Sequence, residues 1–111
     1  MELLYRWQSK EKARREALRQ KVLSRTQRAL GELYSRIPFR RAFIFGSLVR
    51  PGAFGDHSDV DIALEGLPPE RFWEAVALLS EILEREVDVL PLEEARFRKK
   101  IEKEGILWKR P

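Results

Sequence analysis

The sequence contains no cysteine and no asparagine, a single histidine, and only four aspartates among its 18 acidic residues. The absence of cysteine excludes disulfides, zinc–thiolate sites and cysteine nucleophiles. No stretch approaches the roughly 18 consecutive apolar residues of a membrane-spanning helix, and the first ten residues lack the apolar block of a signal peptide. We therefore expect a cytoplasmic protein that does not associate with a membrane.

The composition is that of a globular chain, and its charge is unevenly distributed. Hydrophobic residues make up 43% and charged residues 36% of the 111 positions, which predicts one domain over residues 1–111. Residues 1–41 hold 12 Lys and Arg against 4 Glu, whereas residues 42–111 hold 10 against 14 acidic residues. The basic character thus belongs to the N-terminal third.

A long basic helix is predicted at about residues 8–36. This segment has no proline and only one glycine, Gly31, and it ends before Pro38. Apolar residues recur in it at helical spacing, namely Val22, Thr26, Leu30, Leu33 and Ile37. The stripe is thin before Leu18, so we expect the first turns to project from the body.

The rest of the chain alternates between strand and helix patterns. Strands are predicted at residues 41–45, 59–64 and 86–90, with a short fourth strand at 106–108. A helix is predicted at residues 69–85, with Pro69 in its first turn, and another at residues 92–104, after Pro91. The fold class is therefore α/β (α+β), and the first strand is apolar on both faces, as in the centre of a sheet.

Three of the four aspartates lie in these apolar strands, where aspartate is disfavoured. Side chains alternate along a strand, so Asp59 and Asp61 share the face opposite Val60 and Ile62, and Asp88 repeats the pattern two elements later. Such carboxylates repel one another unless a cation lies between them. With no histidine or cysteine ligand nearby, Mg²⁺ fits best, and two ions could act in a phosphoryl transfer.

A lone Asp-x-Asp is more often a pair of turn or strand-end aspartates that serve solubility. A second feature changes that balance, because Gly46-Ser47 follows the first strand directly. Glycine lets a backbone approach a ligand closely, and the serine hydroxyl with the following amides can donate to phosphate. Arg50 lies three residues further on and could neutralise a triphosphate, although a plain turn and a solvated arginine remain alternatives.

The combined motif resembles that of a known family. It comprises Phe45-Gly46-Ser47, Arg50, Ser58-Asp59-Val60-Asp61-Ile62 and, on a later strand, Glu86-Val87-Asp88-Val89-Leu90. Together these segments resemble the signature of the polymerase-beta nucleotidyltransferase superfamily, and in particular its minimal nucleotidyltransferases (MNT). The resemblance covers roughly residues 37–108 and includes a similar C-terminal helix and tail.

The resemblance implies a palm-like mixed sheet of three to four strands packed with helices. It implies that Asp59, Asp61 and Asp88 are catalytic and bind Mg²⁺, two ions being expected, with Asp88 as the base. Gly46, Ser47 and Arg50 would bind the nucleotide, with ATP as the expected substrate. Family members transfer a nucleoside monophosphate to a hydroxyl, and minimal members are commonly paired with an all-helical HEPN partner. In some pairs this partner is a toxin that the antitoxin transferase inactivates by adenylylation.

Two departures from the family pattern leave alternatives open. Eleven residues separate Ser47 from Asp59, one more than is commonest, and the N-terminal helix is longer and more basic than a minimal domain needs. The chain could instead neutralise a helical partner by contact alone, or act on nucleic acid through its basic helix. The acceptor and the oligomeric state are not fixed by the pattern, although an oligomer is possible.

Overall fold

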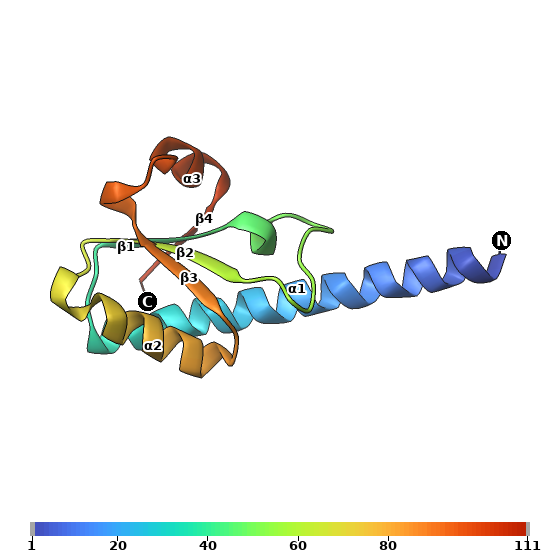
Figure 1. The fold of residues 1–111 in the computed structure, drawn as a ribbon, viewed down its shortest axis with the longest axis horizontal. Coiled ribbons are helices and arrows are strands. Elements are labelled where there is room, and N and C mark those ends of the chain that lie inside the picture. The colour runs from blue at the N-terminus through green and yellow to red at the C-terminus, as the bar shows by residue number, and fades with distance from the viewer. Residues whose placement is uncertain (1, 111) are drawn as a thin grey trace.

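The computed structural model describes residues 2–110, which form an elongated molecule of 55 × 28 × 24 Å. Four strands and three α-helices alternate along the chain (Figure 1). In order they are α1 (Glu2–Arg36), β1 (Arg41–Phe45), β2 (Val60–Glu65), α2 (Phe72–Leu83), β3 (Val87–Pro91), α3 (Arg98–Glu104) and β4 (Ile106–Trp108). Short 3₁₀ turns lie at η1 (Gly46–Val49), η2 (Pro69–Arg71) and η3 (Leu92–Glu94).

The strands form one mixed sheet in the order β3-β2-β1-β4. β1 is antiparallel to both β2 and β4, whereas β2 and β3 are parallel and are joined through α2. The prediction of a mixed sheet of three to four strands packed with helices is therefore confirmed, including the inner position of β1.

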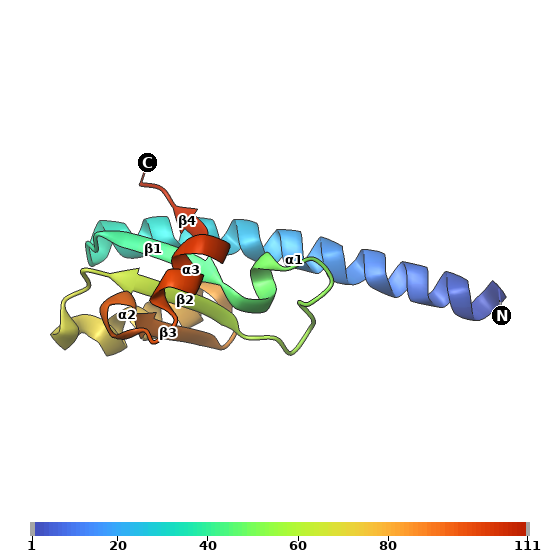
Figure 2. The same ribbon diagram turned by 90° about the horizontal axis from the view of Figure 1, so that it is seen from above.

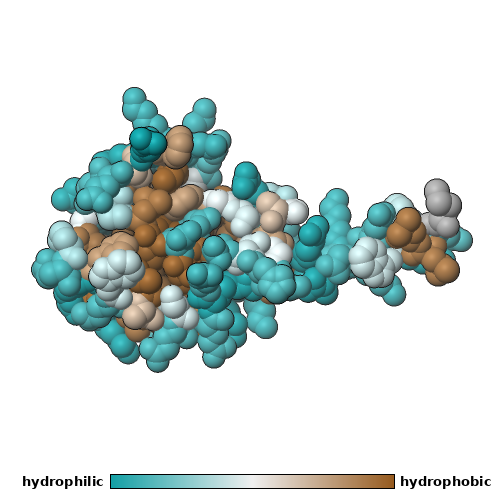
Figure 3. Space-filling model, in the orientation of Figure 1, coloured by the Kyte–Doolittle hydropathy of each residue, from teal (hydrophilic) through white to brown (hydrophobic). Residues whose placement is uncertain are grey.

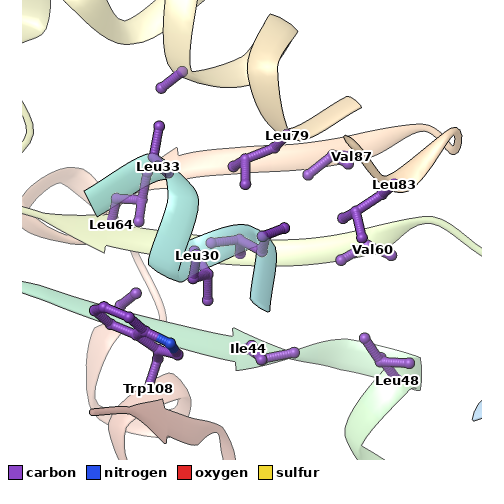
Figure 4. Close-up of a cluster of buried hydrophobic side chains, with 14 of the residues drawn as sticks. Leu30, Leu33, Ile44, Leu48, Val60, Leu64, Leu79, Leu83, Val87 and Trp108 are labelled. Atoms are coloured by element: carbon purple, nitrogen blue, oxygen red, sulfur yellow. The ribbon is translucent and has the colours of Figure 1, made fainter. Parts of the chain in front are cut away.

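The two faces of the sheet are covered differently. α1 and α2 lie side by side on one face and α3 lies on the other (Figures 1 and 2). The face under α1 and α2 carries the main core, in which Leu30, Ile44 and Leu79 meet (Figure 4). Val60, Ile62 and Leu64 all point into this core, as the alternation predicted. A smaller cluster around Phe43 and Ile101 packs under α3.

α1 begins earlier than predicted, at Glu2 instead of about residue 8. Residues 2–7 contain neither glycine nor proline, and Glu2 pairs with Arg6 one turn later at 3.7 Å, so nothing stops the helix there. Its buried residues begin only at Arg19, and the preceding turns extend beyond the body, as expected.

The other two helices are shorter than predicted. α2 ends at Leu83 because Glu84 takes a left-handed conformation with φ 49°. Its buried residues are Ala75, Leu79 and Leu83, whereas Phe72 and Val76, which its periodicity also places inward, are only half-buried.

The segment predicted as one helix over 92–104 is divided into the turn η3 and helix α3. Arg98 at the start of α3 donates from Nη2 to Oε2 of the buried Glu65 at 2.6 Å. Glu65 also accepts from Nε of Arg41 at 2.8 Å, so an ion network joins β1, β2 and α3.

None of the helices within residues 2–110 combines the length and the apolarity that crossing a membrane requires.

Candidate carboxylate and phosphate site

The sheet register brings Asp61 and Asp88 side by side. Asp61 lies on β2 opposite Asp88 of the parallel neighbour β3, and opposite Phe45 of the antiparallel neighbour β1. Adjacent strands are about 4.8 Å apart, so side chains of residues paired in register lie next to one another. Both aspartates point away from the main core, because Val60, Ile62 and Val87 point into it.

Asp59 lies just outside this register. The strand was expected to start at Asp59 but starts at Val60, whose amide donates to the carbonyl of Glu86 at 3.1 Å. Asp59 is exposed, as is Asp88, whereas Asp61 is half-buried. Asp61 is thus the innermost carboxylate of the three.

The electrostatics single out Asp61. Its pKa is raised above the ordinary 3.8, first by burial and then by the negative charges of Asp88 and Asp59. The positive charge of Arg50 acts in the opposite direction and does not offset these effects. The negative charges of the other two predicted carboxylates therefore both act on Asp61, and a cation beside Asp61 would relieve this repulsion.

Gly46 lies so close to Asp61 that a larger residue would displace the Asp61 side chain. It follows β1 directly, has φ +76°, and a Cβ built on it would collide with Oδ2 of Asp61 and lie 3.1 Å from Cγ. The main chain of the Gly46-Ser47 turn therefore lies against the half-buried carboxylate. The sequence predicted a close approach to a ligand at Gly46, and this stays a prediction; the contact described here is with Asp61.

The residues after Gly46 form the 3₁₀ turn η1. Ser47 is half-buried and its carbonyl accepts the amide of Arg50 at 3.1 Å, while the Arg50 side chain is exposed. Leu48 is fully buried, and its carbonyl accepts Nη1 of Arg19 from α1 at 3.0 Å. A buried leucine and an arginine of α1 thus hold the turn beside Asp61.

The connection from the turn to β2 is held by a contact that the sequence analysis missed. Arg85, just after α2, stacks on the ring of the buried Phe54 with 4.8 Å from its Cζ to the ring centroid. Its Nη1 also donates to the carbonyls of Ser58 at 2.8 Å and Gly55 at 3.3 Å. Phe54 is an apolar residue in a loop rich in Gly and Pro, and this was the only signal of such an anchor.

A concave surface of about 430 Å³ lies beside Asp59. Its lining includes Asp56, His57, Asp59, Glu84, Arg85 and Glu86. Four of these are carboxylates, and the arginine is already engaged with the loop backbone. The concavity is therefore acidic, and Asp59 is the one predicted site residue in its lining.

The donor set fits a hard divalent cation, although the side chains do not converge on one point. Across residues 2–110, no three His, Cys, Asp or Glu side chains form a ready-made metal cluster. The chemistry of the set is nevertheless suitable, since three carboxylates lie near one another with no nitrogen or sulfur ligand among them.

The fold and the site together define a class of protein. Residues 32–110 match the family described as polymerase beta, nucleotidyltransferase. The match covers well over half of the chain, including every strand, both predicted phosphate-turn residues and all three aspartates. The chain therefore belongs to the polymerase beta nucleotidyltransferase family.

Solved structures support the same fold. One, described as a toxin–antitoxin with AMP-PNP, has a chain 24% identical with a TM-score of 0.63, over 77% of this chain and 73% of that one. Another, a mutant of the toxin–antitoxin MntA–HpeT, is 21% identical with a TM-score of 0.61 over the same shares. No curated protein matches the chain.

Proposed function

We propose that this chain is a Mg²⁺-dependent nucleotidyltransferase that moves AMP from ATP to a hydroxyl of a HEPN-type partner protein. In this proposal it is the antitoxin of a toxin–antitoxin pair. The observation that carries the chemistry is the placement of Asp61, half-buried between Asp88 and the glycine turn. Family membership supplies the reaction class.

The turn after β1 is the proposed phosphate-binding element. The hydroxyl of Ser47 and the following amides donate to phosphate oxygens, and the close contact of Gly46 with Asp61 keeps this turn beside the carboxylate. Arg50 is exposed and its charge reaches Asp61, so it can pair with the negative charge of a triphosphate.

Asp59, Asp61 and Asp88 are the residues that would hold Mg²⁺. When bound, the ions neutralise the phosphates and polarise the phosphorus–oxygen bond that breaks. Asp61 provides the innermost ligand, and the exposed Asp59 and Asp88 flank it on the solvent side.

The reaction itself is an in-line substitution at the α-phosphorus. The acceptor hydroxyl oxygen forms a bond to this phosphorus while the bond to pyrophosphate breaks, and pyrophosphate leaves with its electron pair. Asp88 takes the proton of the hydroxyl, since it is exposed to an incoming acceptor and adjacent to Asp61 on the next strand.

Two observations support a protein acceptor in a toxin–antitoxin pair. The structurally similar proteins are described as toxin–antitoxins, one of them with the ATP analogue AMP-PNP. The concavity beside Asp59 is also rich in carboxylates, which would repel a nucleic-acid backbone.

The first experiment is a calorimetric titration of ATP into the purified chain, with Mg²⁺ and then with EDTA. We expect binding with Mg²⁺ that is lost with EDTA and in Asp61→Asn. The matched control is Glu81→Gln, which removes an exposed carboxylate on the helix across the sheet and should bind like the wild type. Equal binding of ATP by Asp61→Asn and the wild type would refute the site.

The second experiment tests the acceptor. A HEPN-type toxin, the proposed partner, is incubated with ATP, Mg²⁺ and the chain, and its intact mass is measured. We expect the mass of one or more AMP groups, and none with Asp61→Asn. If Asp61→Asn still neutralises the partner without any adduct, the chain acts by contact alone and the transferase proposal fails.

A further inference from the structure

The N-terminal part of α1 is a helix with no body beneath it. Residues 2–18 are exposed or half-buried, and the first buried residue is Arg19. An isolated helix of about 15 residues is only marginally stable in water. This projecting segment, called the arm below, touches the body through the Arg14–Asp56 ion pair and would gain stability from a surface that covers it.

The arm ends in a cluster of exposed apolar side chains. Leu3, Leu4 and Trp7 are 80%, 56% and 63% exposed, and at helical spacing they lie on one stripe. Figure 3 shows this hydrophobic surface at the far end of α1, separated from the body by a hydrophilic stretch. Large apolar groups gathered at the tip of a charged helix mark an interaction surface.

The same stripe continues toward the body in a heptad pattern. Leu4 and Trp7 are followed at alternating steps of four and three residues by Glu11, Arg14 and Leu18. Beyond Leu18 the stripe reaches a groove of about 140 Å³ between α1 and the end of α2. Leu18 and Leu83 form part of its apolar lining.

We propose that the arm pairs antiparallel with the arm of a second copy of this chain. The pattern is self-complementary in one register. There, Glu11 faces Arg14 of the second copy, and Arg14 faces its Glu11. Trp7 then packs on Leu18 of the second copy, at the mouth of the groove, and Leu4 covers the aliphatic stem of its Lys21.

The residues on either side of these facing pairs are compatible with the same antiparallel register. Antiparallel pairing places Lys10 beside Ala17 of the second copy and Gln8 beside its Arg15, while Leu3 meets its Ser24. None of these pairs brings like charges together. A parallel pair would instead oppose Glu11 to Glu11 and Arg14 to Arg14, which is destabilising.

Charge also distinguishes a second copy from other occupants. Along the stripe from Leu4 to Leu18 the only charges are Glu11 and Arg14, which cancel, so the stripe offers no cationic track for nucleic acid. In the single chain Arg14 pairs with Glu11 at 2.7 Å and with Asp56 at 3.0 Å, both at exposed sites. Exposed ion pairs contribute little to stability. Replacing these pairs within one chain by pairs with a second copy therefore costs little.

The test is the mass of the full chain in solution, measured by sedimentation equilibrium. We expect twice the monomer mass of 13.1 kDa. Trp7→Ala should raise the dissociation constant of the dimer at least about tenfold, within the range for loss of an aromatic residue at the centre of an interface. The matched control Trp73→Ala removes the exposed tryptophan of α2, 77% exposed, and should leave the dimer intact.

Charge reversal tests the register. Glu11→Arg alone and Arg14→Glu alone should each be monomeric, whereas their equimolar mixture should form a heterodimer in which every facing pair is complementary again. If a single variant were monomeric only because its helix had unfolded, mixing it with the other variant would not restore association. Failure of the mixture to associate, or a wild-type chain that stays monomeric at its highest soluble concentration, overturns the proposal.

Cross-linking tests the direction, since the chain has no cysteine of its own. Glu11→Cys mixed with Arg14→Cys should give a mixed disulfide faster than either variant cross-links with itself, because a disulfide needs Cα atoms within about 7 Å. Faster self-linking of Glu11→Cys would show a parallel pair and overturn the antiparallel one.

Discussion

The two faces of the sheet differ in what surrounds the same strand. On one face of β2, Ile62 is fully buried between α1 and α2. On the other, Asp61 is half-buried beside Asp88 and the glycine turn, with only the short α3 covering part of that face. One strand thus supports the fold with one side chain and carries the candidate site with the next.

The comparison shows how a 111-residue chain accommodates repelling charges. The apolar face supplies the stability through burial, which offsets the repulsion among carboxylates on the other face. The buried Glu65 on the charged face is paired with Arg41 and Arg98, whereas Asp61 has no hydrogen-bonded cationic partner within residues 2–110. The paired carboxylate is structural, and the unpaired one is available to a ligand.

The largest expected effect separates the two faces directly. Ile62→Ala should lower the free energy of unfolding by about 2–5 kcal/mol, because it leaves a cavity in the core. Asp61→Asn, one residue away, should leave that free energy unchanged or slightly higher when Mg²⁺ is absent. Urea denaturation of both variants measures this, and a large loss in Asp61→Asn would show that Asp61 serves the fold.

Gly46→Ala should have the next largest effect, on nucleotide binding. Its methyl group would push against Asp61 at a φ of +76°, so Mg²⁺-dependent ATP binding should weaken about a hundredfold, or ~3 kcal/mol. Gly52→Ala is the matched control, because Gly52 has φ +81° with nothing within 4 Å of the added atom. Similar losses in both variants would mean that backbone strain alone is responsible.

Glu65→Gln tests the paired carboxylate. The hydrogen bond from Arg41 lowers the pKa of Glu65, so the charged form is favoured in the folded chain. The variant should lose about 1–3 kcal/mol of stability, since two arginines keep only a neutral partner. The midpoint of thermal unfolding is compared with that of Glu104→Gln, which removes an exposed carboxylate from α3 on the same face. Equal midpoints for the two variants would contradict a structural role for Glu65.

The smallest expected effect is a pH dependence of opposite sign for the two carboxylates. Because the pKa of Asp61 is raised, the folded chain holds a proton that the unfolded chain releases near 3.8, and stability falls as the pH rises through this window. Glu65 has a lowered pKa, so its contribution is lost as the pH falls through its folded-state value. The difference in stability between wild type and Asp61→Asn, measured in EDTA across pH 3–7, isolates the first effect. A difference that does not change with pH would contradict it.

Much of this arrangement is readable from the sequence because strand alternation is a local signal. The pattern around Asp61 predicted which residues enter the core, and it predicted that Asp88 lies on the face opposite Val87 and Val89. A glycine directly after the first strand also predicted a close approach of the backbone to a ligand, and this ligand contact stays a prediction. The catalytic and binding roles of these residues stay predictions.

Other features depend on contacts that no local pattern encodes. The stacking of Arg85 on Phe54 joins residues 31 positions apart, and an apolar residue in the loop does not by itself indicate which side chain it contacts. Helix α3 begins at Arg98, which donates to Glu65 on β2, and the neighbouring Phe97 is exposed. The spacing of residues in the sequence does not show where such a tertiary contact overrides the local helix propensity.

The parallel pairing of β2 and β3 also determines when the site can exist during synthesis. Asp61 and Asp88 become neighbours only after α2 has crossed the sheet and β3 has paired. A nascent chain that has just released β2 from the ribosome holds two of the three aspartates without the strand that aligns the third. Since chains emerge at about 5–20 residues per second, the carboxylate cluster assembles only after a delay of seconds, when the helices that bury the opposite face are already made.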